Sequence, residues 1–235
     1  MQIESALEDA VSRNDCEAAK ILLSCAADVE LYDGGTDTTL LMRAAEKHSS
    51  PEMLELLIEA GAAINKTGGY EGMSPLAFAV SSNAKYALGV VETLISCGAD
   101  VNSADLCDRS VLNYACEKCI DSDTISLLIK NGADVSSVDY EGRTPLMTAA
   151  GSSGKEAAKI VNILLQHGAS ACTIDYGGRT ALHHAAVNER LCGAAEVIDS
   201  LIFAGADVSI KDENGETALD LAKNDEVREI LKELM

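Results

Sequence analysis

The sequence predicts an all-α solenoid of about seven helix pairs, with turn-rich fingers projecting between successive pairs. Three repeating features predict this fold class. Leucines recur 34, 35, 36, 34, 36 and 37 residues apart, a glycine follows most of them at a steady distance, and an aliphatic pair ends three residues before each glycine. Self-similarity at this period is typical of stacked repeats, in which each unit contacts only its neighbours. The leucines are Leu7, Leu41, Leu76, Leu112, Leu146, Leu182 and Leu219; the glycines are Gly61, Gly98, Gly132, Gly168 and Gly205, with Ala26 in the first copy.

The first helix of each pair is predicted from its start signal and its apolar face. Thr144 precedes Pro145, so the threonine is placed to cap a helix whose first residue is proline. Leu146 and the alanines at 149 and 150 then fall on one face at helical spacing. Ser74-Pro75 carries the same start signal, and Ser50-Pro51 marks a helix restart inside an inter-helix loop.

The second helix carries the aliphatic pair and ends at the glycine. The pairs are Leu57-Ile58, Leu94-Ile95, Leu128-Ile129, Leu164-Leu165 and Leu201-Ile202. Glycine suits a helix C-terminus that needs positive φ, and the Asp-x-x-Gly stretch that follows is turn chemistry at the tip of a finger.

The spacing also locates the variable loops. The distance from glycine to the next leucine is nearly constant, at 14 or 15 residues, whereas the distance from leucine to glycine ranges from 20 to 23. We therefore expect the extra residues between the two helices of a pair, at 48–51, 81–87, 117–123, 151–156 and 188–193.

The repeated unit resembles the ankyrin repeat. Its most complete copy reads Asp139-Tyr-Glu-Gly142-Arg-Thr144-Pro145-Leu146-Met-Thr-Ala149-Ala150, and a second runs from Asp175 through Thr180-Ala-Leu182-His183. The resemblance covers nearly the whole chain and implies one ankyrin repeat domain over residues 1–235. Its expected repeats are 1–32 as the N-terminal cap, 33–66, 67–103, 104–137, 138–173, 174–210, and 211–235 as the C-terminal cap.

Composition narrows the class of partner. The formal net charge is −20, and a strongly acidic chain is a poor ligand for nucleic acid or an anionic membrane. A basic protein partner is compatible, although acidity also serves solubility alone. The sequence contains no apolar run long enough to span a membrane and no secretion signal at its start. Its eight cysteines are scattered among different repeats and are not set in a disulfide framework. We therefore expect free thiols, a cytoplasmic protein and no disulfide.

Three short motifs partly match catalytic or metal-binding motifs but lack features that such sites require. Cys116-Glu-Lys-Cys119 lacks the second ligand pair of a zinc site, and Cys116 takes a buried alanine position. The stretch from Gly151 to Lys155 lacks the full phosphate-loop spacing and follows a helix. His183 and His184 are adjacent and therefore point about 100° apart on a helix. We expect no cofactor, no metal and no enzymatic activity.

The variable positions of the finger pattern Asp-x-x-Gly-x-Thr form the candidate site. Its first x position holds Tyr70, Leu106, Tyr140 and Tyr176, and its third holds Met73, Arg109, Arg143 and Arg179. Tyrosine and arginine are enriched at interaction hot spots, so these eight residues are expected to contact a partner. The alternative is that the arginine before the threonine only solvates the turn.

Three functions remain open on the sequence. The ankyrin resemblance implies a non-catalytic scaffold that binds another protein through its finger tips and concave helix face, here expected to act as a monomer. A second possibility is a targeting or regulatory domain of a larger enzyme or a secreted effector. A third is a structural spacer, which would have no partner.

Overall fold

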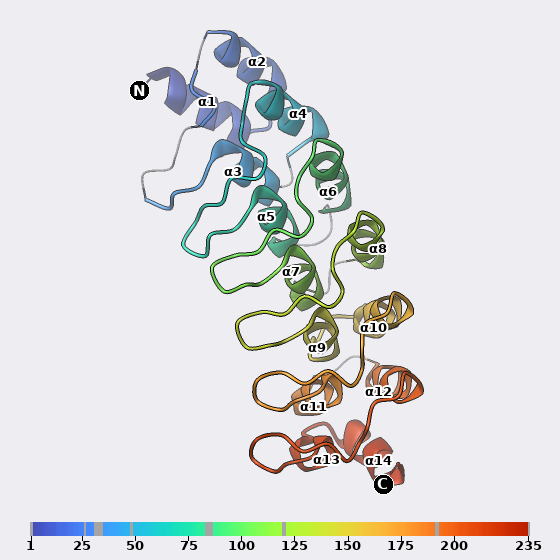
Figure 1. Ribbon diagram of the computed structural model, residues 1–235. Helices are drawn as coiled ribbons and strands as arrows, with labels where there is room; N and C mark the ends of the chain where they lie inside the picture. The colour runs from blue at the N-terminus through green and yellow to red at the C-terminus, as the bar shows by residue number, and fades with distance from the viewer. Residues whose placement is uncertain are drawn as a thin grey trace. The chain divides into compact units, whose positions relative to one another are not determined.

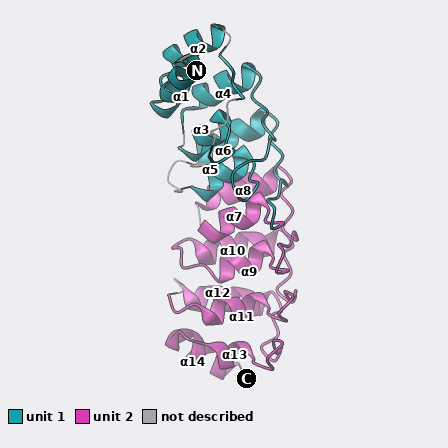
Figure 2. Ribbon diagram, turned by 90° about the vertical axis from the view of Figure 1, so that its left-hand side faces the viewer, with its two compact units in different colours: residues 1–107 teal, residues 108–235 magenta. Residues whose placement is uncertain are grey.

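The computed structural model describes residues 2–25, 27–30, 35–47, 49–82, 87–118, 121–190 and 193–234. The chain divides into two compact units, residues 1–107 and 108–235 (Figure 2). The boundary falls within the fourth expected repeat, so one domain over residues 1–235 remains a prediction. Ala26, Cys119 and Cys192 lie outside the described residues, as do parts of the expected loops at 48–51, 81–87, 117–123 and 188–193.

The first unit contains three helix pairs in its described residues (Figure 1). The first helices of these pairs, α1, α3 and α5, pack on one another in order, and the second helices, α2, α4 and α6, form a second layer. The bounds are α1 (Gln2–Ser12), α2 (Cys16–Ser24), α3 (Leu40–Glu46), α4 (Pro51–Glu59), α5 (Pro75–Ser81) and α6 (Ala87–Ser96).

The second unit repeats this arrangement with four described pairs. Its first-helix layer consists of α7, α9, α11 and α13, and its second-helix layer consists of α8, α10, α12 and α14. The bounds are α7 (Val111–Lys118), α8 (Ser122–Lys130), α9 (Pro145–Ala150), α10 (Ala157–Gln166), α11 (Ala181–Val187), α12 (Ala194–Phe203), α13 (Ala218–Leu221) and α14 (Asp225–Glu233).

The predicted helix starts and ends are confirmed. The side chains of Ser50, Ser74 and Thr144 accept hydrogen bonds from backbone N–H groups three residues on, with proline at the next position in each case. The second helices α4, α6, α8, α10 and α12 end within two residues of the predicted glycines, whose φ angles lie between +89° and +101°. The loop 151–156 separates α9 from α10, as the spacing predicted.

The fingers lie on the side of the first-helix layer in each unit (Figure 1). In the described residues they are turns rather than extended strands, with isolated antiparallel bridges at Gly68–Met73 and Lys211–Thr217. Asp-x-x-Gly sequences favour this outcome because the aspartate side chain supplies hydrogen bonds that a strand partner would otherwise provide.

The core consists of the repeating leucines in both layers. Leu41, Leu146 and Leu182 of the first-helix layers have no exposed surface, and neither do Leu57, Leu94, Leu128, Leu164 and Leu201 of the second-helix layers. Neighbouring alanines such as Ala149 and Ala185 are equally buried. Their small side chains let adjacent helices approach closely. No helix in the described part of the chain is both long and apolar enough to cross a bilayer.

Replacing Leu128 with alanine is expected to lower the free energy of unfolding by about 2–5 kcal/mol, because the side chain is fully buried in α8. Urea denaturation followed by circular dichroism measures the loss. Lys130→Ala, at an exposed position of the same helix, is the control and should change stability by less than about 0.5 kcal/mol. Equal effects of the two substitutions would contradict the assigned packing register.

Candidate functional site

Each finger is built around an aspartate that closes its own turn. In the finger at 139–142, Asp139 Oδ1 accepts hydrogen bonds from the N–H groups of Glu141 at 3.0 Å and Arg143 at 2.9 Å. Asp175 and Asp212 make the same pair of bonds in the next two fingers. The fourth residue of each turn is a glycine at φ between +75° and +79°, a conformation that favours glycine. Three fingers of the second unit therefore share one conformation.

Backbone hydrogen bonds join neighbouring fingers at one repeated position. The N–H of Tyr176 donates to the carbonyl of Glu141 at 3.0 Å, and the N–H of Glu213 donates to Gly177 at 2.9 Å. In the first unit, the N–H of Leu106 donates to Glu71 at 2.9 Å. In these three fingers the backbone of the residue at the first x position is thus held by the preceding finger.

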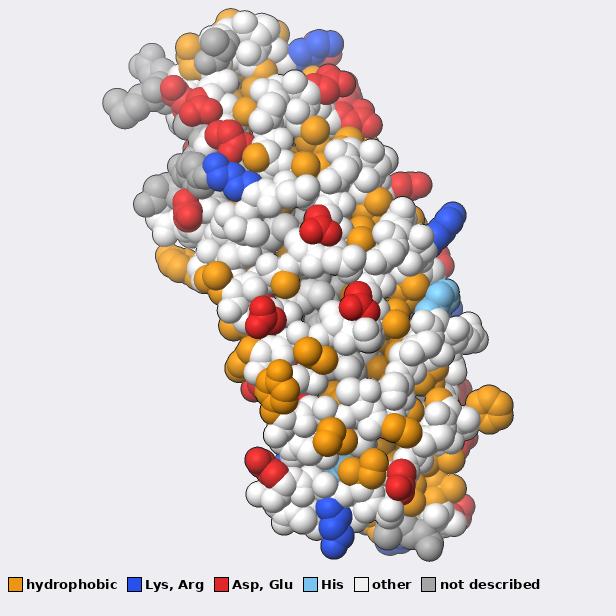
Figure 3. Space-filling model, in the orientation of Figure 1, with side chains coloured by type: hydrophobic (Ala, Val, Ile, Leu, Met, Phe, Trp, Pro, Cys, Tyr) orange, Lys and Arg blue, Asp and Glu red, His pale blue; other side chains and the backbone are white. Residues whose placement is uncertain are grey.

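The side chains at the first x position are nevertheless exposed, as the candidate site requires. Tyr70 is 83% exposed, Leu106 79%, Tyr140 55% and Tyr176 76%. Hydrophobic side chains are visible over the finger side of both units in Figure 3, with carboxylates scattered among them. Tyr70 and Leu106 belong to the first unit, and Tyr140 and Tyr176 to the second.

The side chains at this position pack on the glycine of the preceding finger. A Cβ atom at Gly142 would lie 2.8 Å from Cδ1 of Tyr176 and 2.9 Å from its backbone nitrogen. A Cβ atom at Gly72 would lie 2.8 Å from Cγ of Leu106. One side of the Tyr176 and Leu106 side chains therefore contacts a glycine backbone, while the rest of each side chain faces solvent.

The arginines at the third x position make ion pairs within and between fingers. Nε of Arg143 donates to Oδ2 of Asp139 at 2.9 Å, and the Arg143 guanidinium also pairs with Glu141 at 3.0 Å. Nε of Arg179 donates to Oδ2 of Asp212, in the next finger, at 3.1 Å. The Asp139 and Asp212 side chains are 2% and 0% exposed, so these arginines balance buried charge.

Arg109 and Met73 are the other residues at the third x position. The structure contradicts the expectation that Met73 contacts a partner. The Arg109 guanidinium lies 4.0 Å from the ring centre of Tyr114 in α7 and pairs with Glu117 of that helix. Met73 is only 6% exposed, because its backbone pairs with Gly68 and its side chain turns inward. An apolar side chain gains by burial at a position where an arginine keeps its charged end in water. Met73 therefore does not present an exposed contact.

The two adjacent histidines have separate structural partners. The N–H of Thr180 donates to Nδ1 of His183 at 3.1 Å, which leaves the His183 Nε2–H to donate to the Glu216 carbonyl at 3.3 Å. His184 Nε2 lies 2.8 Å from Asp175 Oδ2. Burial lowers the pKa of both histidines below the ordinary value, which favours their neutral forms. They do not converge on a common ligand.

Two neighbouring grooves follow the fingers of the second unit. One, of 390 Å³, lies over the first-helix layer and is lined by residues of α7, α9 and α11 together with Ser152 and Ser153. The other, of 490 Å³, lies between fingers and is lined by Tyr140, Tyr176 and Glu213 among others. Arg143 and His184 line both. The first unit has a groove of 410 Å³ beside Tyr70 and Phe78.

The structure also describes Cys116 and the 151–156 segment, which belong to the other two short motifs. Cys116 is fully buried in α7, as predicted, and six of the eight cysteines lie in the described residues, where none forms a disulfide. The 151–156 segment is a loop between helices rather than a strand-to-helix turn. Among the residues that the structure describes, no group of three histidine, cysteine, aspartate or glutamate side chains converges as a metal site would.

Sequence reasoning missed one exposed residue. Phe203, the last residue of α12, is 96% exposed and borders a groove of 640 Å³ between α10 and α12. The signal was present, since the residue after each aliphatic pair is Glu59, Ser96, Lys130 or Gln166 in the other repeats. Only in this repeat is the position aromatic.

Replacing Gly142 with alanine is expected to destabilise the second unit by more than the same change at Gly215. Both glycines have φ near +78°, but a Cβ atom meets Tyr176 at Gly142 and nothing within 4 Å at Gly215. The strain of positive φ, about 1–2 kcal/mol, is common to both, so the difference isolates the packing of Tyr176. Urea denaturation of the two variants measures it; equal losses would show that the ring does not rest on Gly142.

Replacing Asp212 with asparagine is expected to lower stability at neutral pH and to matter less in acid. Burial acts to raise the pKa of Asp212, but hydrogen bonds from Glu216 N–H, Arg179 and Asn214 N–H outweigh it and hold the pKa below its ordinary value. A depressed pKa contributes stability above the unfolded value of about 3.9, and this contribution is lost as pH falls through the folded value.

The urea midpoints of the parent and Asp212→Asn proteins should therefore converge below about pH 4. Asp199→Asn, at an exposed carboxylate, controls for removing one negative charge from an acidic chain. A difference between parent and Asp212→Asn that does not change with pH would contradict the role assigned to the Asp212 charge.

Comparison with known proteins agrees with the fold. A family model described as ankyrin repeats (3 copies) matches residues 7–105, 84–172 and 112–212. The crystal structure of the ankyrin repeat domain of Bcl-3, described as a unique member of the IkappaB protein family, has a TM-score of 0.76 at 26% identity. That of the human ASB11 ankyrin repeat domain has a TM-score of 0.80 at 25% identity, and each covers 97% of both chains.

Curated relatives extend the comparison to full-length proteins. The chicken (Gallus gallus) nuclear factor NF-kappa-B p105 subunit is 32% identical over 67% of this chain and 16% of its own length. The human ankyrin repeat and SOCS box protein 6 is 31% identical over 62% of this chain and 36% of its own length. The chain thus spans well under half of these relatives. The repeats, the fingers and the family match together show that the chain belongs to the ankyrin repeat family.

Proposed function

We propose that this chain is a non-catalytic scaffold that binds another protein through its finger tips and the adjoining first-helix face. Ankyrin repeat domains are protein-interaction modules, and the relatives found here are regulatory or adaptor proteins. The observation that carries the proposal is the exposure of Tyr70, Leu106, Tyr140 and Tyr176, together with the backbone hydrogen bonds that hold Leu106 and Tyr176 to the preceding finger.

Fixed backbone and exposed side chains favour binding for a physical reason. Ordering a loop at an interface costs free energy, and a finger already held by hydrogen bonds avoids most of that cost. A tyrosine that rests on Gly142 with one side offers its remaining surface without a large entropy loss. The grooves beside Tyr140 and Tyr176 supply concave surface for a partner's side chains.

The arginines contribute in a second way within this proposal. Arg143 and Arg179 hold the finger aspartates through Nε, so they position the turn as well as lining the groove. Arg109 is held over Tyr114 and lines the neighbouring groove. Removing an arginine therefore changes the finger itself, whereas removing a tyrosine changes mainly the exposed surface.

The proposed setting is the cytoplasm, with the chain acting as a monomer and without nucleic acid or membrane as partner. Scattered cysteines suit a reducing compartment. A net charge of −20 opposes both self-association and contact with phosphate-rich surfaces. It is compatible with a basic partner protein.

A second candidate is a targeting or regulatory domain of a larger enzyme or a secreted effector. The observation that favours it is that the chain matches only 16% to 36% of the length of the first relatives. In that case the same finger surface would bring a partner to the rest of the protein.

The finger surface is tested with the variant Tyr140→Ala/Tyr176→Ala. A partner recovered from the native host by affinity capture and identified by mass spectrometry is purified, and its affinity for parent and variant is measured by calorimetry. We expect a loss of at least about tenfold, or 1.4 kcal/mol, with little change in melting temperature.

The matched control is Ile21→Ala, which removes an exposed apolar side chain, 61% exposed, from α2, a second-layer helix. It should leave the affinity unchanged. If the tyrosine variant binds as tightly as the parent while both remain folded, the fingers of the second unit are not the binding surface.

A further inference from the structure

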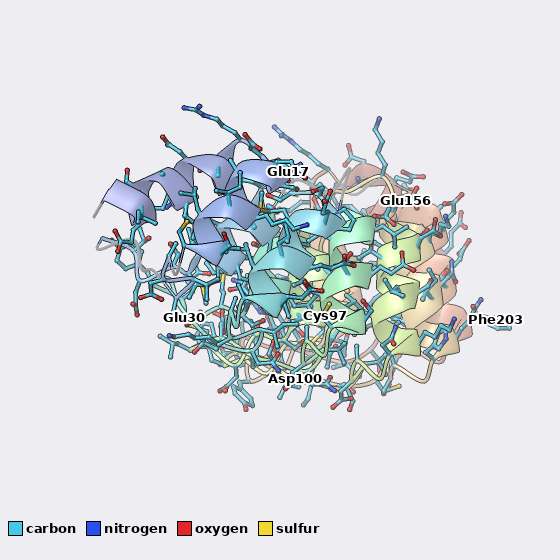
Figure 4. The ribbon with its side chains drawn as sticks, turned by 90° about the horizontal axis from the view of Figure 1, so that it is seen from above. Glu17, Glu30, Cys97, Asp100, Glu156 and Phe203 are labelled. Atoms are coloured by element: carbon cyan, nitrogen blue, oxygen red, sulfur yellow. The ribbon has the colours of Figure 1, made fainter. Side chains whose placement is uncertain are left out.

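A second surface, on the other helix layer, is marked by Phe203. In the other four repeats with an aliphatic pair, the next residue is polar: Glu59, Ser96, Lys130 and Gln166. Here it is phenylalanine at the end of α12, 96% exposed, and Figure 4 shows it projecting outward from the helix. The neighbouring Leu201 has no exposed surface and already supplies this repeat's contribution to the core. The fold therefore does not require an aromatic residue at this position.

Phe203 borders a mainly apolar groove. The groove has a volume of 640 Å³ and lies between α10 and α12, which pack side by side in the second-helix layer. Leu165 and Gln166 of α10 face Ser200, Phe203 and Ala204 across it. None of its lining residues belongs to a finger or to the first-helix layer, so it is separate from the proposed finger surface.

Two carboxylates extend the same face of α12. Glu196, Asp199 and Phe203 follow one another at spacings of three and four residues, which places them along one side of the helix. Both carboxylates are exposed, and in the described part of the chain neither forms an ion pair. Asp199 thus lines the groove together with Phe203, and Glu196 lies beyond its lining on the same face of α12.

We propose that the groove between α10 and α12 binds an amphipathic helix of a partner protein, with aliphatic side chains against Phe203 and Leu165 and lysine or arginine beside Asp199 and Glu196. Helices dock into such grooves through apolar residues at i, i+3, i+4 and i+7. Asp199 at the groove and Glu196 beyond it favour a basic helix over an acidic one.

The same charges disfavour a second copy of this chain as the occupant. A symmetric contact through Phe203 would bring Asp199 and Glu196 close to their own counterparts, within an assembly of two chains that each carry a net charge of −20. A basic partner helix relieves this repulsion instead of adding to it.

The test uses three synthetic helical peptides of about 15–18 residues. The probe peptide carries leucine at i, i+3, i+4 and i+7 with lysine at the flanking positions. One control replaces its lysines with glutamate and the other replaces its leucines with alanine. Binding to the full chain is followed by nitrogen-15 NMR, which also reports which backbone amides shift.

We expect the probe peptide to shift amides of α10 and α12 and to bind more tightly than both control peptides. Phe203→Ser should raise its Kd by about tenfold or more, as loss of a central aromatic anchor does. The melting temperature should not change, because the side chain is exposed. Glu59→Ser, the matched variant at the same position of α4, should leave the Kd unchanged.

The Tyr140→Ala/Tyr176→Ala variant separates this proposal from the finger surface, because it should bind the probe peptide as the parent does. Three results would overturn the proposal. These are a Kd that Phe203→Ser leaves unchanged, equal binding of the leucine and alanine peptides, and self-association in sedimentation experiments that disappears with Phe203→Ser.

Discussion

Helices of four to eleven residues are too short to persist alone in water, so every element of this chain depends on burying its leucines against the neighbouring pair. Leu146 and Leu164 illustrate the constraint: each has no exposed surface, and each lies on a helix that packs on its own partner and on the helices of both neighbouring pairs. Alanine beside leucine keeps the helices close, and a hydroxyl cap followed by proline fixes where the first helices α5 and α9 begin. Stability in each unit is therefore a property of adjacent pairs and not of single repeats.

The fingers solve a different physical problem, that of keeping an exposed loop in one shape. Asp139, Asp175 and Asp212 close their own turns, glycine provides the positive φ, and a backbone hydrogen bond connects successive fingers. The buried carboxylates of Asp139 and Asp212 would be costly without a cation, and Arg143 and Arg179 supply it, whereas Asp175 lies beside His184. The resulting loops are ordered without depending on the side chain at the first variable position.

Much of this architecture could be predicted from the sequence because local rules determine it. The glycine after each aliphatic pair fixes the end of the second helix, and Thr144-Pro145 fixes the start of α9, so both could be read from single positions. The exposure of Tyr140 and Tyr176 followed from the turn pattern. The arginine partners did not, because Arg143 reaches its own finger and Arg179 the next one, a choice set by tertiary spacing. The prediction that Met73 is exposed was wrong, because an apolar side chain at the third x position is buried whereas an arginine there keeps its charged end in water.

The closing of each turn by its own aspartate and glycine has a consequence for how such a chain can change over time. The residues that determine the shape of a finger are not the residues that it displays. Substitutions at positions such as Tyr140 and Tyr176 leave the turn hydrogen bonds of Asp139 and Asp175 in place. The displayed side chains can therefore diverge between duplicated copies while folding is conserved, and a library randomised at these positions would vary the exposed surface on an unaltered framework.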